Sequence, residues 1–135
     1  MPKGADYILY RVNGTDREGK FEIWRRYSDF EVLRQTLVER FPGLYVPPIP
    51  KKKAIGNKNA TFLDERCFLL NMFLKQLARC PYLIESEEFG IWIKPQNTNN
   101  MQRELSLLPR ISPENLLNRI QQYYSFLGEI NDQQI

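Results

Sequence analysis

The sequence predicts an α+β domain in which a small antiparallel β-sheet packs against a helical subdomain, with an extra amphipathic helix at the C-terminal end. Two features predict this class. The hydrophobic pattern alternates every second residue in residues 6–12 and 20–27, and it changes to the 3.6-residue period of a helix at Ser28. The 135 residues, 42% of them hydrophobic, suit one globular domain with a substantial core.

The N-terminal part has the pattern of a β-hairpin. The segments DYILYRV (6–12) and KFEIWRRY (20–27) alternate and are rich in β-branched and aromatic residues, and the polar stretch NGTDREG (13–19) is expected to turn the chain. Because successive side chains of a strand point to opposite faces, Arg25 and Arg26 are expected to point in opposite directions. Only one of them can then serve a given site, and the alternative is that both are solvated charges.

A helix is expected from Ser28 to Phe41, where a proline and a glycine end it. Ser28 and Glu31 have the spacing of a capping box, in which both side chains accept hydrogen bonds from backbone N–H groups of the first turn. A helix start also attracts anionic phosphates, and Arg26 would strengthen such a site. The apolar face of this helix consists of Phe30, Leu33, Leu37 and Phe41.

The next segment, residues 43–61, is expected to be extended, because the three prolines of PPIP exclude a regular helix. A run of lysines is usually a solvated loop. Long loops inside compact domains are uncommon unless they have a function, so this loop is a candidate functional segment. Its lysines are Lys51, Lys52, Lys53 and Lys58.

A second long helix is expected from near Thr61 to Cys80, and its apolar stripe contains an arginine. Arg66 falls within this stripe rather than on the polar side of the helix. An arginine there needs an anionic partner or must reach solvent, so two readings remain: a salt bridge within the protein, or a bound anionic ligand. The stripe comprises Leu63, Leu70, Phe73 and Leu77.

The composition argues against an enzyme and against a metal site. The chain has no histidine, which removes the usual general base and the commonest transition-metal ligand. Cys67 and Cys80 are too few for a disulfide framework or a four-cysteine zinc site and are read as packing residues in a reducing compartment. The acidic residues, as in ESEEF (85–89), are expected at the surface. No cofactor or metal is expected.

The basic residues are concentrated in the first half of the chain. Residues 1–66 contain 13 Lys and Arg against 9 Asp and Glu, a net charge of +4, whereas residues 67–135 contain 6 against 7, a net charge of −1. This local excess suits a phosphate or an anionic membrane surface better than a nucleic acid. No apolar run approaches a membrane span, and the start of the chain lacks a signal-peptide core, so a cytosolic protein is expected.

The C-terminal segment SPENLLNRIQQYYSFLG (112–128) is expected to form an amphipathic helix. Ser112 is its predicted N-cap, and Pro113 occupies the first helical position. Three roles remain open: the helix packs back on the domain, leads into a further dimerising domain, or binds a partner. Its predicted apolar face consists of Leu116, Ile120, Tyr123 and Leu127, before Gly128.

RRYSDF (25–30), PPIPKKK (47–53) and FLDERCFLLNMFLKQL (62–77), in this order and spacing, resemble the phox homology (PX) domain, most closely that of sorting nexins. The resemblance covers roughly residues 7–93. It implies a small antiparallel sheet on a helical subdomain, and phosphatidylinositol 3-phosphate on endosomal membranes as the ligand. On this basis residues 1–95 are expected to form the PX domain, and residues 96–135 a linker with the C-terminal helix.

Carried over by position, the resemblance implies a role for each of five headgroup-binding residues. Arg26 resembles the arginine that pairs with the 3-phosphate, and Tyr27 the aromatic residue that packs under the inositol ring. Ser28 resembles the helix-start residue that contacts the phosphate. Lys52 resembles the lysine that holds the 1-phosphate, and Arg66 the arginine that binds the inositol hydroxyls. The loop that would meet the bilayer contains Lys51, Lys53, Ile55 and Lys58.

The resemblance implies a module that recruits its protein to endosomal membranes, as a cytoplasmic protein bound peripherally and active in trafficking or sorting. The family normally has another strand before residue 7, so the expected sheet lacks its usual first strand or has an open edge. A second hypothesis is that PPIPKK (47–52) is a ligand for an SH3 domain and the lipid pocket is vestigial. Protein partners are expected through this segment or the C-terminal helix, and no nucleic acid.

Overall fold

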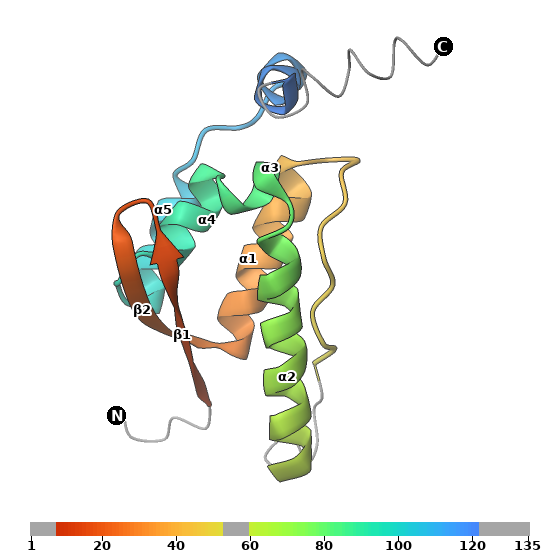
Figure 1. Ribbon diagram of the computed structural model, residues 1–135. Helices are drawn as coiled ribbons and strands as arrows, with labels where there is room; N and C mark the ends of the chain where they lie inside the picture. Colours follow the sequence, from red (N-terminus) through yellow and green to blue (C-terminus); the bar gives the residue numbers. More distant parts are fainter. Residues whose placement is uncertain (1–7, 53–59, 122–135) are drawn as a thin grey trace.

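A computed structural model of the protein describes residues 8–52 and 60–121, and these residues form an α+β fold, as predicted. In Figure 1 the hairpin lies on one side, and α1 and α2 run beside each other at the centre. The short helices α3, α4 and α5 follow α2, and both α4 and α5 contact α1. The elements are β1 (Leu9–Asp16), β2 (Gly19–Arg26), α1 (Tyr27–Arg40), α2 (Ala60–Leu77), α3 (Pro81–Ile84), α4 (Glu87–Ile93) and α5 (Thr98–Ser106).

The hairpin is longer than the sequence pattern indicated. β1 and β2 pair antiparallel from Leu9 opposite Arg26 to Asp16 opposite Gly19, which leaves only residues 17 and 18 to turn the chain. Gly19 has φ +118°, a backbone conformation that favours glycine. The predicted turn over residues 13–19 was therefore too long. Most of this end of the hairpin is solvent-exposed, so polar residues there can pair as strand without reaching the core.

Helix α1 begins one residue earlier than predicted, and this changes its cap. Arg26 is the N-cap, and the Asp29 carboxylate accepts a hydrogen bond from the Arg26 backbone N–H at 2.8 Å. The predicted capping box of Ser28 and Glu31 was wrong, because the earlier start makes Asp29 the third helical residue. The predicted apolar face is confirmed, since Phe30, Leu33, Leu37 and Phe41 are buried.

Arg25 and Arg26 have different surroundings, as the alternation predicted. Arg25 is only 2% exposed and donates hydrogen bonds to the carbonyl oxygens of Trp92, Lys94 and Gln96 at 2.8–3.1 Å. The alternative that Arg25 is a solvated charge is wrong. Its guanidinium joins β2 to the C-terminal end of α4, so Arg25 is part of the core.

Arg66 and three apolar residues of the predicted stripe, Leu70, Phe73 and Leu77, form the buried face of α2. Aromatic rings connect α1 to α2 and α4: Phe30 lies 4.9 Å from Trp92 and 6.4 Å from Phe73 between ring centroids. Cys80 packs against the core, whereas Cys67 is exposed, so a packing role for Cys67 was wrong. None of the helices within residues 8–52 and 60–121 is long and apolar enough to cross a membrane.

The segment expected to be a linker contains the ordered helix α5, which the sequence analysis did not anticipate. Met101 and Leu105 of α5 are buried in the same core as α1 and α4. A further helical segment begins at Pro113 and is described to Gln121. Ser112 accepts a hydrogen bond from the backbone N–H of Asn115, which matches its predicted role as a cap.

This last helical segment packs back on the domain, the first of the three possible roles. Arg119 donates to both carboxylate oxygens of Glu88 at 2.9 and 3.3 Å, and Leu116 packs against the core. Arg40 donates to the same carboxylate, which is fully buried. The expectation of a solvated acidic surface is thus wrong for Glu88. Tyr123, Leu127 and Gly128 lie outside the described residues.

Candidate functional site

The most unusual side chain of the domain is Arg66, which is 7% exposed and lies between two aromatic rings. Its guanidinium carbon lies 3.9 Å from the centroid of the Tyr27 ring and 4.6 Å from that of Phe62. Such contacts attract the charge to the π faces but use none of the N–H donors. The Nε and Nη2 atoms of Arg66 are buried and have no hydrogen-bond partner among residues 8–52 and 60–121.

The two unpaired donors help to decide whether Arg66 forms a salt bridge within the protein or binds an anionic ligand. In the described part of the chain no carboxylate forms an ion pair with Arg66, so a salt bridge within the protein finds no support there. A buried donor without an acceptor costs about 1–3 kcal/mol. An anionic or polyhydroxylated ligand at this position would supply the acceptors.

Tyr10 belongs to the same surroundings, and the sequence motifs did not point to it. Its hydroxyl is buried and, within the described residues, has no hydrogen-bond partner. Burial raises the pKa of Tyr10, and the nearby positive charge of Arg66 acts in the opposite direction. Tyr10 therefore stays neutral near pH 7, with its hydroxyl beside Arg66.

Arg26 ends β2, and its side chain is about one third exposed, so it can reach a ligand from the protein surface. Its Nε lies 3.9 Å from Oδ2 of the buried Asp29, which is longer than a hydrogen bond. The same Asp29 oxygen accepts from the Thr98 hydroxyl at 3.1 Å. Asp29 thus anchors the backbone at Arg26, a role that its position three residues later could have indicated. Ser28, half-buried, is the second residue of α1.

Tyr27 joins this site to the proline segment. Its side chain is 8% exposed, one face of its ring is covered by Arg66, and its hydroxyl donates to the carbonyl oxygen of Pro50. Burial and the charge of Glu31 raise the pKa of Tyr27, against the influence of Arg66, so the hydroxyl keeps its proton near pH 7. Lys51 and Lys52 follow directly and are exposed.

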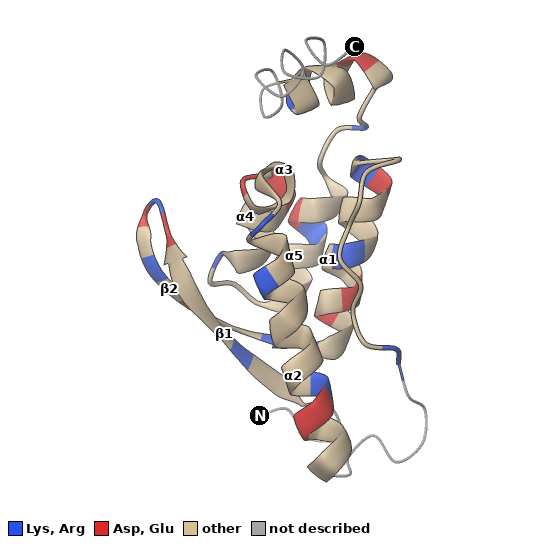
Figure 2. Ribbon diagram, turned by 45° about the vertical axis from the view of Figure 1, so that its right-hand side comes forward, with Lys and Arg blue, Asp and Glu red and all other residues tan. Residues whose placement is uncertain are grey.

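Several predicted site residues are thus brought together by the fold. Tyr27 contacts Arg66, is flanked in sequence by Arg26 and Ser28, and holds the segment that leads to Lys52. In Figure 2 the basic end of this segment and the first half of α2 lie at the same end of the molecule. The predicted membrane-loop residues Lys53, Ile55 and Lys58 lie outside the described residues.

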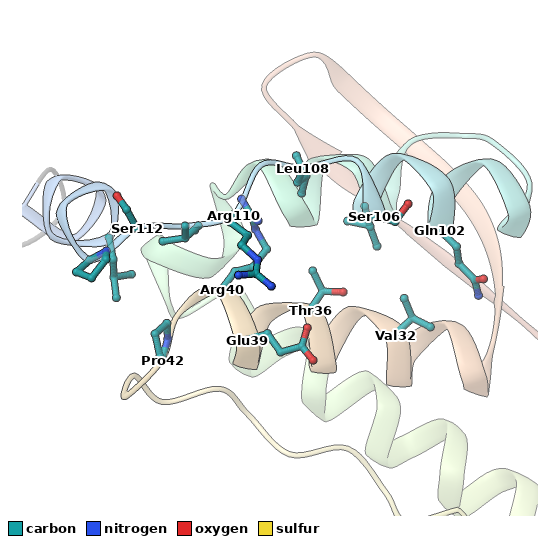
Figure 3. A pocket seen from close by; sticks show the side chains of 14 residues that line it. Val32, Thr36, Glu39, Arg40, Pro42, Gln102, Ser106, Leu108, Arg110 and Ser112 are labelled. Atoms are coloured by element: carbon teal, nitrogen blue, oxygen red, sulfur yellow. The ribbon is translucent and has the colours of Figure 1, made fainter.

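A sizeable hollow lies elsewhere in the described part of the chain. It has a volume of about 700 Å³ and is bounded by α1, α5 and the chain that follows α5, and Figure 3 shows Val32, Thr36 and Arg40 lining it. None of the predicted headgroup residues borders it. A second hollow of about 630 Å³, between β2 and residues 95–99, includes Arg25 and Arg26. Neither hollow is lined by Tyr27 or Arg66. The candidate site is therefore defined by the buried donors of Arg66 that no described residue pairs, and not by the volume of a hollow.

Known proteins resemble this chain in sequence and in fold. A family model described as the PX domain matches residues 13–96. The chain belongs to the PX domain family. It is similar to sorting nexin-41 of Emericella nidulans, with 38% identity over 98 residues, which cover 66% of this chain and 15% of that protein. It is also similar to human sorting nexin-7, with 33% identity over 99 residues, covering 67% and 26%.

Solved structures show the same fold. A designed CISK-PX domain covers 70% of this chain and 90% of its own, with a TM-score of 0.62 and 26% identity. The SNX-BAR protein Mvp1, solved as a tetramer, covers 99% of this chain and 42% of its own, with a TM-score of 0.65 and 22% identity. This PX domain chain spans only 15–28% of the length of the first four curated relatives. Membership of the PX family supports a phosphoinositide-binding module.

Proposed function

We propose that this PX domain binds phosphatidylinositol 3-phosphate and thereby recruits its protein to the cytoplasmic face of endosomal membranes, in membrane trafficking or sorting. The observation that carries the proposal is Arg66, a buried guanidinium with two donors that no described residue satisfies. Protein interiors normally pair such groups, and their exceptions concentrate at functional sites. A phosphorylated inositol offers the hydroxyl and phosphate oxygens that these donors lack.

In this proposal each cationic group has the chemistry of its expected partner. Arg26 presents a planar fork of donors beside the first turn of α1, where backbone N–H groups and the side chain of Ser28 converge on the 3-phosphate. Lys52 supplies a mobile point charge for the 1-phosphate. Lys51, Lys53 and Lys58 would add general attraction to an anionic bilayer, at up to about 1 kcal/mol for each residue, with Ile55 contacting the lipid.

The test is sedimentation with vesicles that contain a single phosphoinositide, across a panel of all the headgroups. We expect binding to vesicles with phosphatidylinositol 3-phosphate and at least tenfold weaker binding to vesicles with phosphatidylserine alone at equal charge. Equal binding to every anionic vesicle would mean that the domain reads only surface charge. Preference for another phosphoinositide would retain the pocket and correct its ligand.

The alternative that PPIPKK is an SH3 ligand is disfavoured by the position of its first proline. An SH3 domain reads both prolines of a P-x-x-P segment from an exposed polyproline helix. Here Pro47 is buried, and its carbonyl oxygen accepts a hydrogen bond from Arg34 at 2.9 Å. Binding to an SH3 domain would require the segment to leave the surface of the domain.

A further inference from the structure

The proline segment is fixed to the domain by three side chains that donate to its backbone carbonyls. Tyr82 of α3 donates to Tyr45 at 2.6 Å, Arg34 of α1 donates to Pro47 at 2.9 Å, and Tyr27 of α1 donates to Pro50. A polyproline segment has no internal hydrogen bonds, so such outside contacts decide where it lies. In Figure 1 the segment leaves the end of α1 and runs toward the N-terminal end of α2.

The bond from Tyr27 is the one nearest the lysines. The carbonyl oxygen of Pro50 belongs to the peptide bond that connects Pro50 to Lys51, and Lys52 is the next residue. Pro50 is half-buried, whereas both lysines are exposed, so the chain leaves the domain surface at this point. In the described part of the segment the Tyr27 hydroxyl is thus the last side-chain anchor before Lys52.

The same tyrosine also places Arg66. The guanidinium lies 3.9 Å from the centre of the Tyr27 ring, so the ring contacts Arg66 while the hydroxyl holds Pro50. One rigid side chain therefore relates a cation of α2 to a cation of the proline segment. Aromatic rings suit this task because a tyrosine has only two side-chain torsions to immobilise.

We propose that the Tyr27 hydroxyl is a positioning group: by holding the Pro50 carbonyl, it sets the place of Lys52 relative to Arg66 so that both reach one phosphorylated inositol headgroup. This inference rests on the proposed function, and it gives the hydroxyl a role separate from that of the aromatic ring. Without the bond, the chain around Lys52 samples more positions, and the headgroup must order it on binding.

The decisive variants are a matched pair. Tyr27→Phe and Tyr82→Phe each remove one tyrosine hydroxyl that donates to a carbonyl of the same segment, at its two ends. We expect Tyr27→Phe to weaken binding to phosphatidylinositol 3-phosphate vesicles roughly two- to tenfold, the equivalent of one hydrogen bond. Tyr82→Phe should leave binding within about twofold. Equal losses in the two variants, or no loss in Tyr27→Phe while the wild type binds, would overturn the inference.

Removing the lysine tests whether the hydroxyl acts through it. In a Lys52→Ala background, Tyr27→Phe should cost less than about twofold, because the group that it positions is absent. A full additional loss in that background would show that the hydroxyl acts independently of Lys52. Soluble dibutanoyl phosphatidylinositol 3-phosphate separates the headgroup from the bilayer. The Tyr27→Phe loss should persist with this soluble probe, and a loss seen only with vesicles would contradict a headgroup role for Lys52.

A measurement without ligand separates this inference from the proposed function. Backbone ¹⁵N relaxation should show lower order parameters at Lys51 and Lys52 in Tyr27→Phe than in the wild type or Tyr82→Phe. Unchanged order parameters would show that the Tyr27 hydroxyl does not restrain the segment around Lys52. If the anchor is present but the wild type binds neither vesicles nor the soluble probe, the proposed function fails and the ligand role of Tyr27 fails with it.

Discussion

Replacing Arg66 with leucine should separate stability from binding, because no carboxylate within residues 8–52 and 60–121 forms an ion pair with this arginine. The leucine side chain fits the apolar face formed with Leu70 and Phe73. The change removes two buried donors that no described residue satisfies, and each such donor costs the folded state about 1–3 kcal/mol. It also removes the contacts of the cation with Tyr27 and Phe62, each contributing about 0.5–2 kcal/mol.

The cost of the two unpaired donors and the gain from the two ring contacts nearly cancel. Their sum slightly favours the folded state of Arg66→Leu over that of the wild type. We expect the free energy of unfolding of Arg66→Leu, measured by urea denaturation, to be unchanged or higher by up to about 2 kcal/mol. Binding should fall, because each charge-assisted hydrogen bond to a ligand contributes about 1.5–3 kcal/mol, so one lost contact already costs at least about tenfold in affinity. Vesicle sedimentation with phosphatidylinositol 3-phosphate measures this loss.

Two controls make the result interpretable. Arg79→Leu removes the same charge from an exposed position just beyond α2 and should leave specific binding unaltered. Arg66→Lys keeps the charge but loses the planar fork, so it should recover little of the affinity. A loss of more than about 2 kcal/mol of stability in Arg66→Leu would show that the arginine is structural. Undiminished binding by the folded variant would show that Arg66 does not contact the ligand.

Three further predictions concern other charged groups. Arg26→Ala should weaken binding at least tenfold while the domain stays folded, by circular dichroism and sedimentation, and persistent binding would remove its phosphate role. Replacing Lys51 and Lys53 with alanine should weaken binding mildly and flatten its salt dependence, and a switched headgroup preference would contradict this. Arg119→Ala should lower the free energy of unfolding by about 1–3 kcal/mol. Glu88→Gln should lower it by more, because the glutamine leaves both Arg40 and Arg119 without a carboxylate partner.

The pH dependence of the Glu88 contribution has a defined sign. Burial alone would raise the pKa of Glu88, but hydrogen bonds from Arg119 and Arg40 outweigh it and hold the pKa below its ordinary value. A depressed carboxyl pKa stabilises the fold above the unfolded-state value, which is about 4.3, and this contribution is lost as the pH falls through the folded-state pKa. The stability difference between wild type and Glu88→Gln should be constant from pH 7 to about 5.

The hairpin, α1 and α2 were predictable because their signals are local, whereas α3, α4 and α5 were not predicted. The apolar faces of α1 and α2 recur with the helical period, and the alternation in β2 correctly separated Arg25 from Arg26. The errors arose where a contact from a distant residue decides the outcome. Arg25 is buried because three carbonyls near the end of α4, 67–71 residues later, accept its hydrogen bonds. No window of sequence around Arg25 contains that information.

The candidate site, like the fold, was predicted from the sequence only in part. The motif around Arg26 and the arginine within an apolar stripe were visible in the sequence, and the structure adds that Tyr27 and Arg66 are in contact. Asp29, which anchors the backbone at Arg26, was hidden because the helix start was placed one residue late. The hydrogen bond from Tyr27 to Pro50 depends on the path of a segment that has no periodic pattern, so only the three-dimensional arrangement could reveal it.

Arg66 differs from two other buried charges of the domain, Glu88 and Arg25, in its hydrogen-bond partners. Glu88 is fully buried but receives two arginines, and Arg25 donates to carbonyls at the end of α4. The fold can therefore compensate buried charges where they serve structure alone. Arg66 is also buried, but its guanidinium lies against the rings of Tyr27 and Phe62, and no described residue accepts a hydrogen bond from its Nε and Nη2 atoms. Unlike Glu88 and Arg25, Arg66 therefore keeps two donors unpaired among the described residues, and the proposed headgroup would supply their acceptors.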